Sequence, residues 1–189
     1  MRLRNIPGAD EAIADSPHCI QEPMAEKGRW HLIFGNENPI HIEIGMGKGQ
    51  FIMKLAKEHP DINYIGIERY SSVLLRALQK MEIEPLPNIR FLCMDASIIT
   101  EVFDKEEVAK IYLNFSDPWP KERHAKRRLT HGNFLQLYRR VLPMGGEIHF
   151  KSDNDKLFEW SLEEIPQFGF RLSQVTRDPV SYTHLRAHE

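Results

Sequence analysis

The chain has 189 residues, of which 41% are hydrophobic and 28% are charged, as is typical of one globular domain with a sizeable core. Its formal net charge of −2 excludes a general attraction to nucleic acid, so any such binding has to come from a local basic patch. Cys19 and Cys93 match no metal-ligand spacing, and we find neither a signal peptide nor an apolar run long enough for a membrane span, so we expect a cytoplasmic protein without a bound metal.

Strand-like and helix-like segments alternate along most of the chain. In chain order we expect a strand at 40–44, a helix at 50–58, a strand at 62–67, a helix at 71–81, strands at 89–94 and 110–115, a helix at 130–142 that Thr130 caps, a strand at 147–151, a helix at 155–165 and a strand at 168–175. This alternation predicts an α/β fold whose mostly parallel sheet has helices on both faces. The domain is expected at 39–177, after an N-terminal arm of residues 1–38 with one helix near 23–34.

The first expected strand ends in a glycine-rich loop. The order of residues there is Glu43, Ile, Gly45, Met, Gly47, Lys and Gly49. Ligands of parallel sheets bind at the carboxyl ends of strands, and glycine lets the backbone approach them closely. Because Gln50 replaces the third glycine of the dinucleotide fingerprint, the loop indicates S-adenosylmethionine, with Glu43 near its cationic amino acid part. An unrelated ligand, or none, is the alternative.

Two further acids follow the next strands. Glu68 stands at the end of the second strand, where a carboxylate can accept hydrogen bonds from ribose hydroxyls, and Asp95 ends the third, where it can accept one from an adenine amino group. Either acid alone is better explained as a helix cap. Acids at three successive strand ends predict a nucleoside site.

The segment 111–128 carries the strongest functional signal. An apolar strand ends in Asp117, which stands between a serine and a proline, and Trp119 follows as a residue that either stacks on a base or anchors the loop. Five basic residues then fall within eight positions, namely Lys121, Arg123, Lys126, Arg127 and Arg128. The segment predicts an enzyme that acts on a base while it holds a phosphate backbone. A Pro-rich turn followed by a solvated charged stretch is the alternative.

These motifs resemble the bacterial tRNA (guanine-N7)-methyltransferases from about Arg2 to about Arg177. The most specific match is 115–128, and shorter matches lie at 43–49, 66–68, 95–96 and 150–153. The resemblance implies a Rossmann-like class I methyltransferase fold. It also implies that a methyl group is transferred from S-adenosylmethionine to N7 of guanine 46 in the variable loop of tRNA.

Residue roles follow from the motifs and the resemblance together. The expected cofactor-binding residues are Glu43, Gly45, Gly47, Gly49, Glu68, Asp95 and Asp117, and Asp117 is also the expected catalytic residue. The expected substrate-binding or RNA-binding residues are Lys121, Asp153, Arg123, His124, Lys126, Arg127, Arg128 and Trp119. We expect tRNA as the partner, with no membrane and no metal, in either a monomer or a homodimer.

The end of the chain departs from the family pattern. Residues 178–189 match no family motif, so we expect a disordered tail in a chain truncated at its C-terminus. The last antiparallel strand of the fold and a Thr-x-x-Glu substrate motif are then expected to be missing.

Two other functions compete with this one. N-methyltransferases that act on exocyclic amines carry two prolines after the acid or Asn, whereas only Pro118 follows Asp117 directly here. An RNA-binding protein that kept the fold and lost its chemistry is the second alternative, and the intact strand-end acids argue against it.

Overall fold

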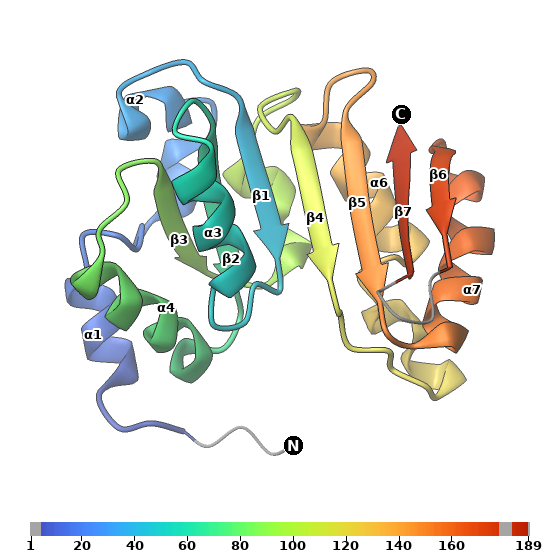
Figure 1. The fold of residues 1–189 in the computed structure, drawn as a ribbon, viewed down its shortest axis with the longest axis horizontal. Coiled ribbons are helices and arrows are strands. Elements are labelled where there is room, and N and C mark those ends of the chain that lie inside the picture. Colours follow the sequence, from blue (N-terminus) through green and yellow to red (C-terminus); the bar gives the residue numbers. More distant parts are fainter. Residues whose placement is uncertain (1–4, 178–182, 189) are drawn as a thin grey trace.

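The computed structural model describes residues 5–177, and the backbone alone of residues 183–188. Its strands form one sheet in the order β3-β2-β1-β4-β5-β7-β6 (Figure 1). The strands are β1 Ile40–Ile44, β2 Asn63–Glu68, β3 Ile89–Cys93, β4 Lys110–Asn114, β5 Glu147–Ser152, β6 Arg171–Thr176 and β7 Thr183–His188. The first five pair in parallel, and this confirms the mostly parallel α/β sheet.

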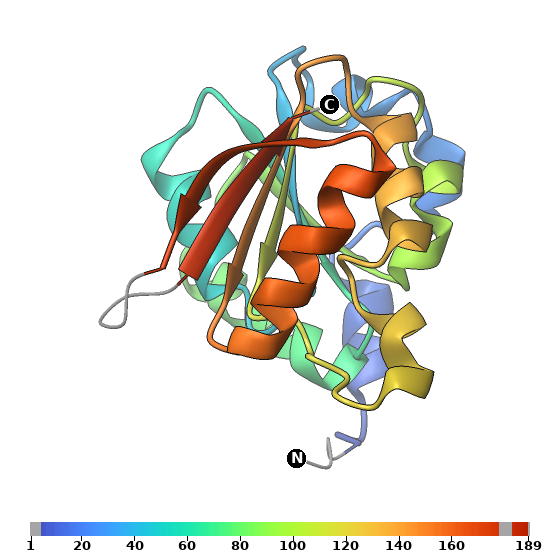
Figure 2. The same cartoon turned by 90° about the vertical axis from the view of Figure 1, so that its right-hand side faces the viewer.

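Helices lie on both faces of the sheet, as expected. The α-helices are α1 Ala9–Asp15, α2 Trp30–Phe34, α3 Gln50–Glu58, α4 Ser71–Ile83, α5 Ile99–Val102, α6 Gly132–Val141 and α7 Asp155–Glu164, and the 3-10 helices are η1 Pro23–Glu26, η2 Ala96–Ile98, η3 Glu122–Arg127 and η4 Ile165–Phe168. Figure 2 shows the sheet from its β6 side, with α3 on one face and α6 and α7 on the other. Within the described residues, no helix is long and apolar enough to cross a membrane.

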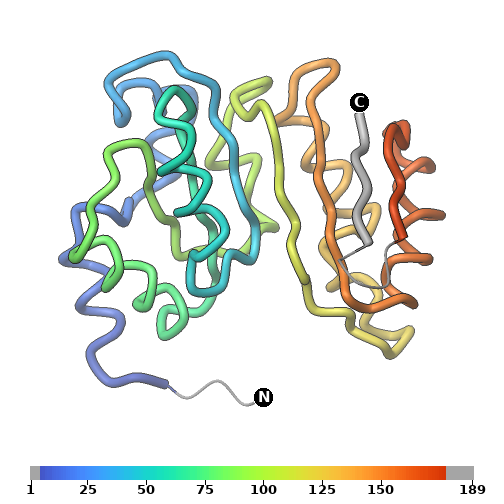
Figure 3. The backbone as a smooth tube through the Cα atoms, viewed as in Figure 1, coloured from blue at the N-terminus to red at the C-terminus, as the bar shows by residue number. Residues whose placement is uncertain are grey.

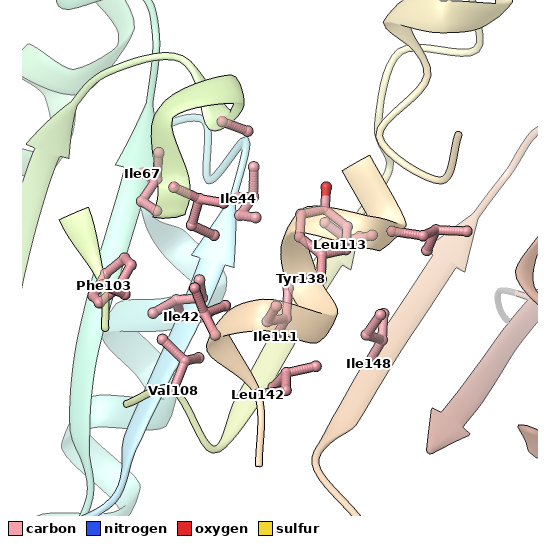
Figure 4. Packing of buried hydrophobic residues seen from close by; sticks show 14 of the residues in the cluster. Ile42, Ile44, Ile67, Phe103, Val108, Ile111, Leu113, Tyr138, Leu142 and Ile148 are labelled. Carbon is pink, nitrogen blue, oxygen red and sulfur yellow. The ribbon is translucent and has the colours of Figure 1, made fainter. Parts of the chain in front are cut away.

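Each face of the sheet has its own apolar core. Alternate residues of the central strands, such as Ile42, Ile111 and Ile148, pack against Tyr138 and Leu142 of α6 and its C-terminal end (Figure 4). On the opposite face a second cluster joins residues of α3 and α4 to side chains of β2 and β3. Burial on both faces explains why β1 and β2 are buried along their full lengths.

The N-terminal arm differs from the single expected helix. Gly28, at φ 76°, separates η1 from α2, and α1 lies earlier in the chain. Between α1 and η1, the backbone of Cys19 pairs in parallel with Phe91 at the outer edge of β3. The arm thereby covers that edge of the sheet (Figure 3), and this protects backbone groups that would otherwise be unpaired.

The start of α6 also differs from expectation. His131 is the N-cap, because its Nδ1 accepts a hydrogen bond from the backbone amide of Asn133 at 3.0 Å. Thr130 does not cap the helix. Its buried hydroxyl instead lies 2.7 Å from the hydroxyl of Ser161 on α7. The expected cap was therefore one residue early, because a contact with α7 uses the threonine side chain.

The expectation that the last antiparallel strand is missing is wrong. Strand β7 lies between β5 and β6 and pairs antiparallel with both, from Glu147 opposite His188 to Ser152 opposite Thr183 on the β5 side. Of the expected disordered tail at 178–189, residues 178–182 and 189 lie outside the described residues, and 183–188 form β7. Strand pairing uses backbone groups, so a segment without family motifs can still fill this position.

Trp30 anchors the N-terminal arm to the core. Its side chain is fully buried, and its indole Nε1 donates a hydrogen bond to the carbonyl oxygen of Val102 at 2.9 Å. The ring also packs against Phe103, with 5.5 Å between ring centroids. The arm is thus held both by packing and by a buried polar contact.

Replacing Trp30→Phe should lower the free energy of unfolding by about 1–3 kcal/mol, because the buried Val102 carbonyl then loses its donor. Lost ring volume adds to this cost. Urea unfolding monitored by circular dichroism measures the change. Leu32→Ala is the matched control from the same helix, since Leu32 is 60% exposed. Equal stabilities for the two variants would contradict the anchoring role.

Candidate functional site

A cavity of about 390 Å³ opens at the carboxyl ends of β1, β2, β3 and β4. The strand order reverses between β1 and β4, and ligands of open parallel sheets bind at such a switch point. Apolar walls come from Ile44, Ile67, Val73, Met94, Leu129 and Phe134. Three of the expected acids, Glu68, Asp95 and Asp117, border the same cavity.

The glycine loop forms one wall of the cavity with backbone alone. Gly45 and Gly47 border the cavity and have φ angles of 74° and 59°, in the left-handed region that favours glycine. Gly49 does not border it. A Cβ at Gly49 would lie 3.0 Å from that of Ala77, so this glycine allows α3 and α4 to pack closely.

Glu68 and Asp95 have backbone partners and border the cavity as well. The carboxylate of Glu68 accepts hydrogen bonds from the amides of Gly47 at 3.0 Å and Tyr70 at 3.2 Å, and burial raises its pKa. Asp95 caps η2 by accepting from the amide of Ser97 at 2.8 Å. Asp95 can therefore cap η2 and still offer an acceptor at the cavity, because a carboxylate has more than one acceptor site.

Glu43 lies beside the cavity and is only 2% exposed, without bordering it. Its Oε2 accepts a hydrogen bond from the side-chain amide of Asn114 at 2.7 Å, whereas Oε1 is buried without a partner among the described residues. Burial raises the pKa of Glu43 to about 8. Asn114 Oδ1 and Ser116 Oγ are also buried and have no hydrogen-bond partner within the part of the chain that the structure describes. These oxygens can receive a donor group from a ligand.

The loop that carries Asp117 has an unusual backbone. Phe115 and Trp119 have φ angles of 55° and 44°, which cost about 1–3 kcal/mol each for residues other than glycine. The amide of Phe115 donates to the carbonyl oxygen of Lys151 at 2.9 Å, which ties the loop to the end of β5. Asp117 is exposed at the cavity, and its charge contributes to the raised pKa of Glu68 after the larger effect of burial.

Trp119 borders the cavity within a small aromatic and cationic group. The guanidinium of Arg127 lies 4.9 Å from the centroid of the indole ring, and the His124 ring meets it edge-on at 5.8 Å. Both expected roles of Trp119 remain compatible with this position, because the half-buried ring packs on neighbours and still borders the cavity.

The basic residues are placed in two different ways. Lys126 and Arg127 are exposed and border the cavity, while Lys121 and Arg123 are exposed farther out. Arg128 is only 5% exposed, and its guanidinium donates to the carbonyl oxygens of Pro118 and Trp119. The expectation that Arg128 contacts RNA stays a prediction, and its burial and its hydrogen bonds to two backbone carbonyls favour a structural role instead.

Asp153 is exposed just after β5 and does not border the cavity. Sequence reasoning also missed several residues that do, among them Arg69, Tyr70 and Ser116. Arg69 covers the ring of Tyr70 at 5.1 Å and lies 3.9 Å from the Asp95 carboxylate. The only signal for Arg69 and Tyr70 was their position directly after the strand-end acid Glu68.

Comparison with known proteins identifies the family. The family described as "Putative methyltransferase" matches residues 37–182. The tRNA (guanine-N(7)-)-methyltransferase of Lachnoclostridium phytofermentans is 57% identical over 178 residues, which cover 94% of this chain and 83% of that protein. The enzyme of the same name from Bacillus subtilis is 51% identical over 94% of this chain and 84% of its own length.

Solved structures support the fold. A structure described as an antibiotic-related methyltransferase superposes with a TM-score of 0.64 at 20% identity, over 85% of this chain and 92% of its own. The 16S rRNA (adenine(1408)-N(1))-methyltransferase from Catenulisporales acidiphilia, solved with its cosubstrate SAM, gives a TM-score of 0.62 at 15% identity, over 99% of this chain and 93% of its own. The expected Rossmann-like methyltransferase fold is confirmed.

The buried Glu43 should make the free protein less stable as the pH rises. The folded pKa of about 8 exceeds the unfolded value of 4.5, so between these values unfolding releases a proton and stability falls with rising pH. Glu43→Gln removes this loss and keeps an acceptor for Asn114. The variant should exceed the parent by at least about 1 kcal/mol at pH 8, with a smaller difference at pH 5.

Urea unfolding without cofactor at pH 5, 6.5 and 8 measures this difference. Glu37→Gln, at an exposed loop position, is the control and should track the parent at every pH. A gain for Glu43→Gln that does not change with pH would contradict the burial argument.

The cavity fits the cofactor of this family. The unpartnered oxygen of Glu43 suits a cationic amine, and the carboxylates of Glu68 and Asp95 can accept from hydroxyl and amino donors. Apolar side chains and a glycine backbone complete a surface for a nucleoside. From its sequence relatives, fold and cavity, the chain belongs to the tRNA (guanine-N7)-methyltransferase family, with S-adenosylmethionine as its cofactor.

Proposed function

We propose that this protein transfers a methyl group from S-adenosylmethionine to N7 of guanine 46 in the variable loop of cytoplasmic tRNA. The observation that carries the proposal is one cavity with two kinds of wall. Its lining includes the glycine loop and the strand-end acids Glu68 and Asp95, and it also includes Asp117, Trp119, Lys126 and Arg127. A cofactor and a base held on a phosphate backbone can therefore meet within one space.

The cofactor is held by groups that match its own donors. Glu68 accepts from the ribose hydroxyls, Asp95 from the adenine amino group, and Glu43 from the ammonium of the amino acid part. The backbone of Gly45 and Gly47 lets the ligand approach β1 closely. When bound, the cofactor supplies an electrophilic methyl group on a sulfonium sulfur.

Asp117 orients the guanine and compensates its charge. Guanine N7 has an in-plane lone pair and no proton, so the reaction needs no general base. The product ring is cationic, and a carboxylate nearby stabilises that charge as it develops. Asp117 accepts from the guanine N1–H and amino groups, and this pattern selects guanine over adenine. Catalysis is therefore positioning together with electrostatic stabilisation.

The exposed cations hold the RNA backbone. The four exposed cations lie on or beside η3 and bind phosphates without reading sequence. Lys126 and Arg127 border the cavity, and Lys121 and Arg123 lie farther out. Trp119 offers an aromatic surface for the base, and His124 supports its edge. Asp153 contacts the substrate from the end of β5. The chain as a whole is weakly acidic, so this local group supplies the attraction.

Incubation with labelled cofactor and unmodified bulk tRNA tests the proposal. Nucleoside analysis should yield 7-methylguanosine, and sequencing should place it at position 46. A transcript with adenine at position 46 is the matched control and should stay unlabelled. A methyl group on an exocyclic amine, or at another position, would overturn the proposal and favour a different nucleic-acid methyltransferase.

Asp117→Asn keeps the shape of the side chain but removes its charge. Turnover should fall by about 100-fold or more, because charge stabilisation in the transition state is lost. The dissociation constant for tRNA should change by less than about threefold, because phosphate contacts supply most of the affinity. Single-turnover kinetics and filter binding measure the two quantities. An undiminished rate at saturating tRNA would remove Asp117 from the mechanism.

A further inference from the structure

We propose that Arg128 is a positioning residue: it fixes the loop that carries Asp117 and Trp119 and fastens that loop to helix α7. This inference rests on the proposed function, because it assigns Arg128 to the methyl-transfer site. It also gives Arg128 a different role from its exposed neighbours Lys126 and Arg127, although all three side chains are basic.

The guanidinium of Arg128 is bonded to the loop backbone. Its Nε lies 3.1 Å from the carbonyl oxygen of Pro118 and 3.2 Å from that of Trp119, and its Nη2 lies 3.0 Å from the same Trp119 oxygen. A planar guanidinium with several donors suits two successive carbonyls, and a lysine ammonium lacks this fork. The side chain is 5% exposed, so water does not compete strongly for these carbonyls.

These bonds act where the backbone is strained. Trp119 has a φ of 44°, and Phe115 on the other side of Asp117 has a φ of 55°. Residues other than glycine keep such angles only where surrounding contacts enforce them. Lys151 holds the Phe115 end through a backbone hydrogen bond, and Arg128 holds the Trp119 end. Asp117 is therefore fixed from both sides.

Helix α7 supplies the fixed support. The guanidinium carbon of Arg128 lies 4.7 Å from the centroid of the Trp160 ring, and the His131 ring stacks on Trp160 at 6.1 Å. The hydroxyls of Thr130 and Ser161, both buried, lie 2.7 Å apart in the adjoining layer. A cation on an aromatic face is worth most when both are desolvated, which suits a charge that is buried here.

The chain offers a test that separates support from phosphate binding. Arg128→Lys keeps the charge and loses the fork, Arg128→Met loses both, and Trp160→Leu removes the aromatic support while leaving Arg128 in place. Arg140→Lys on α6 is the matched control at an exposed arginine, and Lys126→Ala is the control for a lost phosphate contact.

Each variant is measured for melting temperature, cofactor affinity, kcat, tRNA KM, salt dependence of tRNA binding, and hydrogen exchange of peptides covering 115–127.

Positioning predicts that Arg128→Lys lowers kcat at least tenfold, with the KM for tRNA changed less than threefold. Amide exchange in 115–127 should become at least tenfold faster, and Trp160→Leu should change both quantities in the same direction. The slope of log affinity against log salt should stay the same in Arg128→Lys and Arg128→Met, whereas Lys126→Ala should reduce it by about 1. Arg140→Lys should match the parent throughout.

Two results would overturn the inference. One is an active Arg128→Lys together with a reduced salt slope in Arg128→Met, which identifies a phosphate contact. The other is unchanged exchange in 115–127 for Trp160→Leu, which decides the question even if the Arg128 variants do not fold. If the parent protein methylates no tRNA, the proposed function fails, and the exchange data still support or overturn the positioning role.

Discussion

The parallel pairing of β1 with β2 and β4, continued by the pairing of β2 with β3, is the constraint on which the rest of the site depends. It brings the carboxyl ends of strands from distant parts of the chain to one edge of the sheet. The glycine loop, Glu68, Asp95 and Asp117 each follow one of these ends, and each then borders the same cavity. The apolar residues that bury both faces of β1 and β2 therefore determine where the polar residues meet.

The buried carboxyl group of Glu43 has a raised pKa, and a bound cation would change its protonation state. The carboxyl group lies in a strand buried on both faces. One oxygen accepts a hydrogen bond from Asn114, and the other has no partner among the residues that the structure describes. A pKa of about 8 means that the free protein holds a proton there at neutral pH. A cationic ligand reverses that preference, because it favours the ionised form. The buried carboxyl group therefore destabilises the free protein above its unfolded pKa, and in the proposed function it contributes to recognition of a cationic cofactor.

The basic residues 126–128 differ in burial, since two are exposed and the third is buried. Lys126 and Arg127 are exposed and border the cavity, where they bind phosphates in the proposed function. Arg128, next in the chain, is buried. Its guanidinium donates hydrogen bonds to the carbonyl oxygens of Pro118 and Trp119 and lies over the ring of Trp160. Accurate placement of a catalytic carboxylate requires such support, since errors near 1 Å can cost large factors in rate. In the proposed positioning role of Arg128, helix α7 supports the site without bordering the cavity.

The sequence alone determined the elements with strong periodicity and the residues at their ends. β1 and α3 begin and end where the pattern placed them, because apolar runs and a glycine turn define them locally. The strand-end acids were predictable for the same reason. Tertiary contacts decided the rest. The hydroxyl of Thr130 forms a hydrogen bond with that of Ser161 instead of capping α6, and Gly28 separates the expected helix of the arm into two. The last strand formed through backbone pairing that leaves no side-chain signature. Arg128 was buried while Arg127 was not, because the partners of an arginine lie in segments that only the fold brings together.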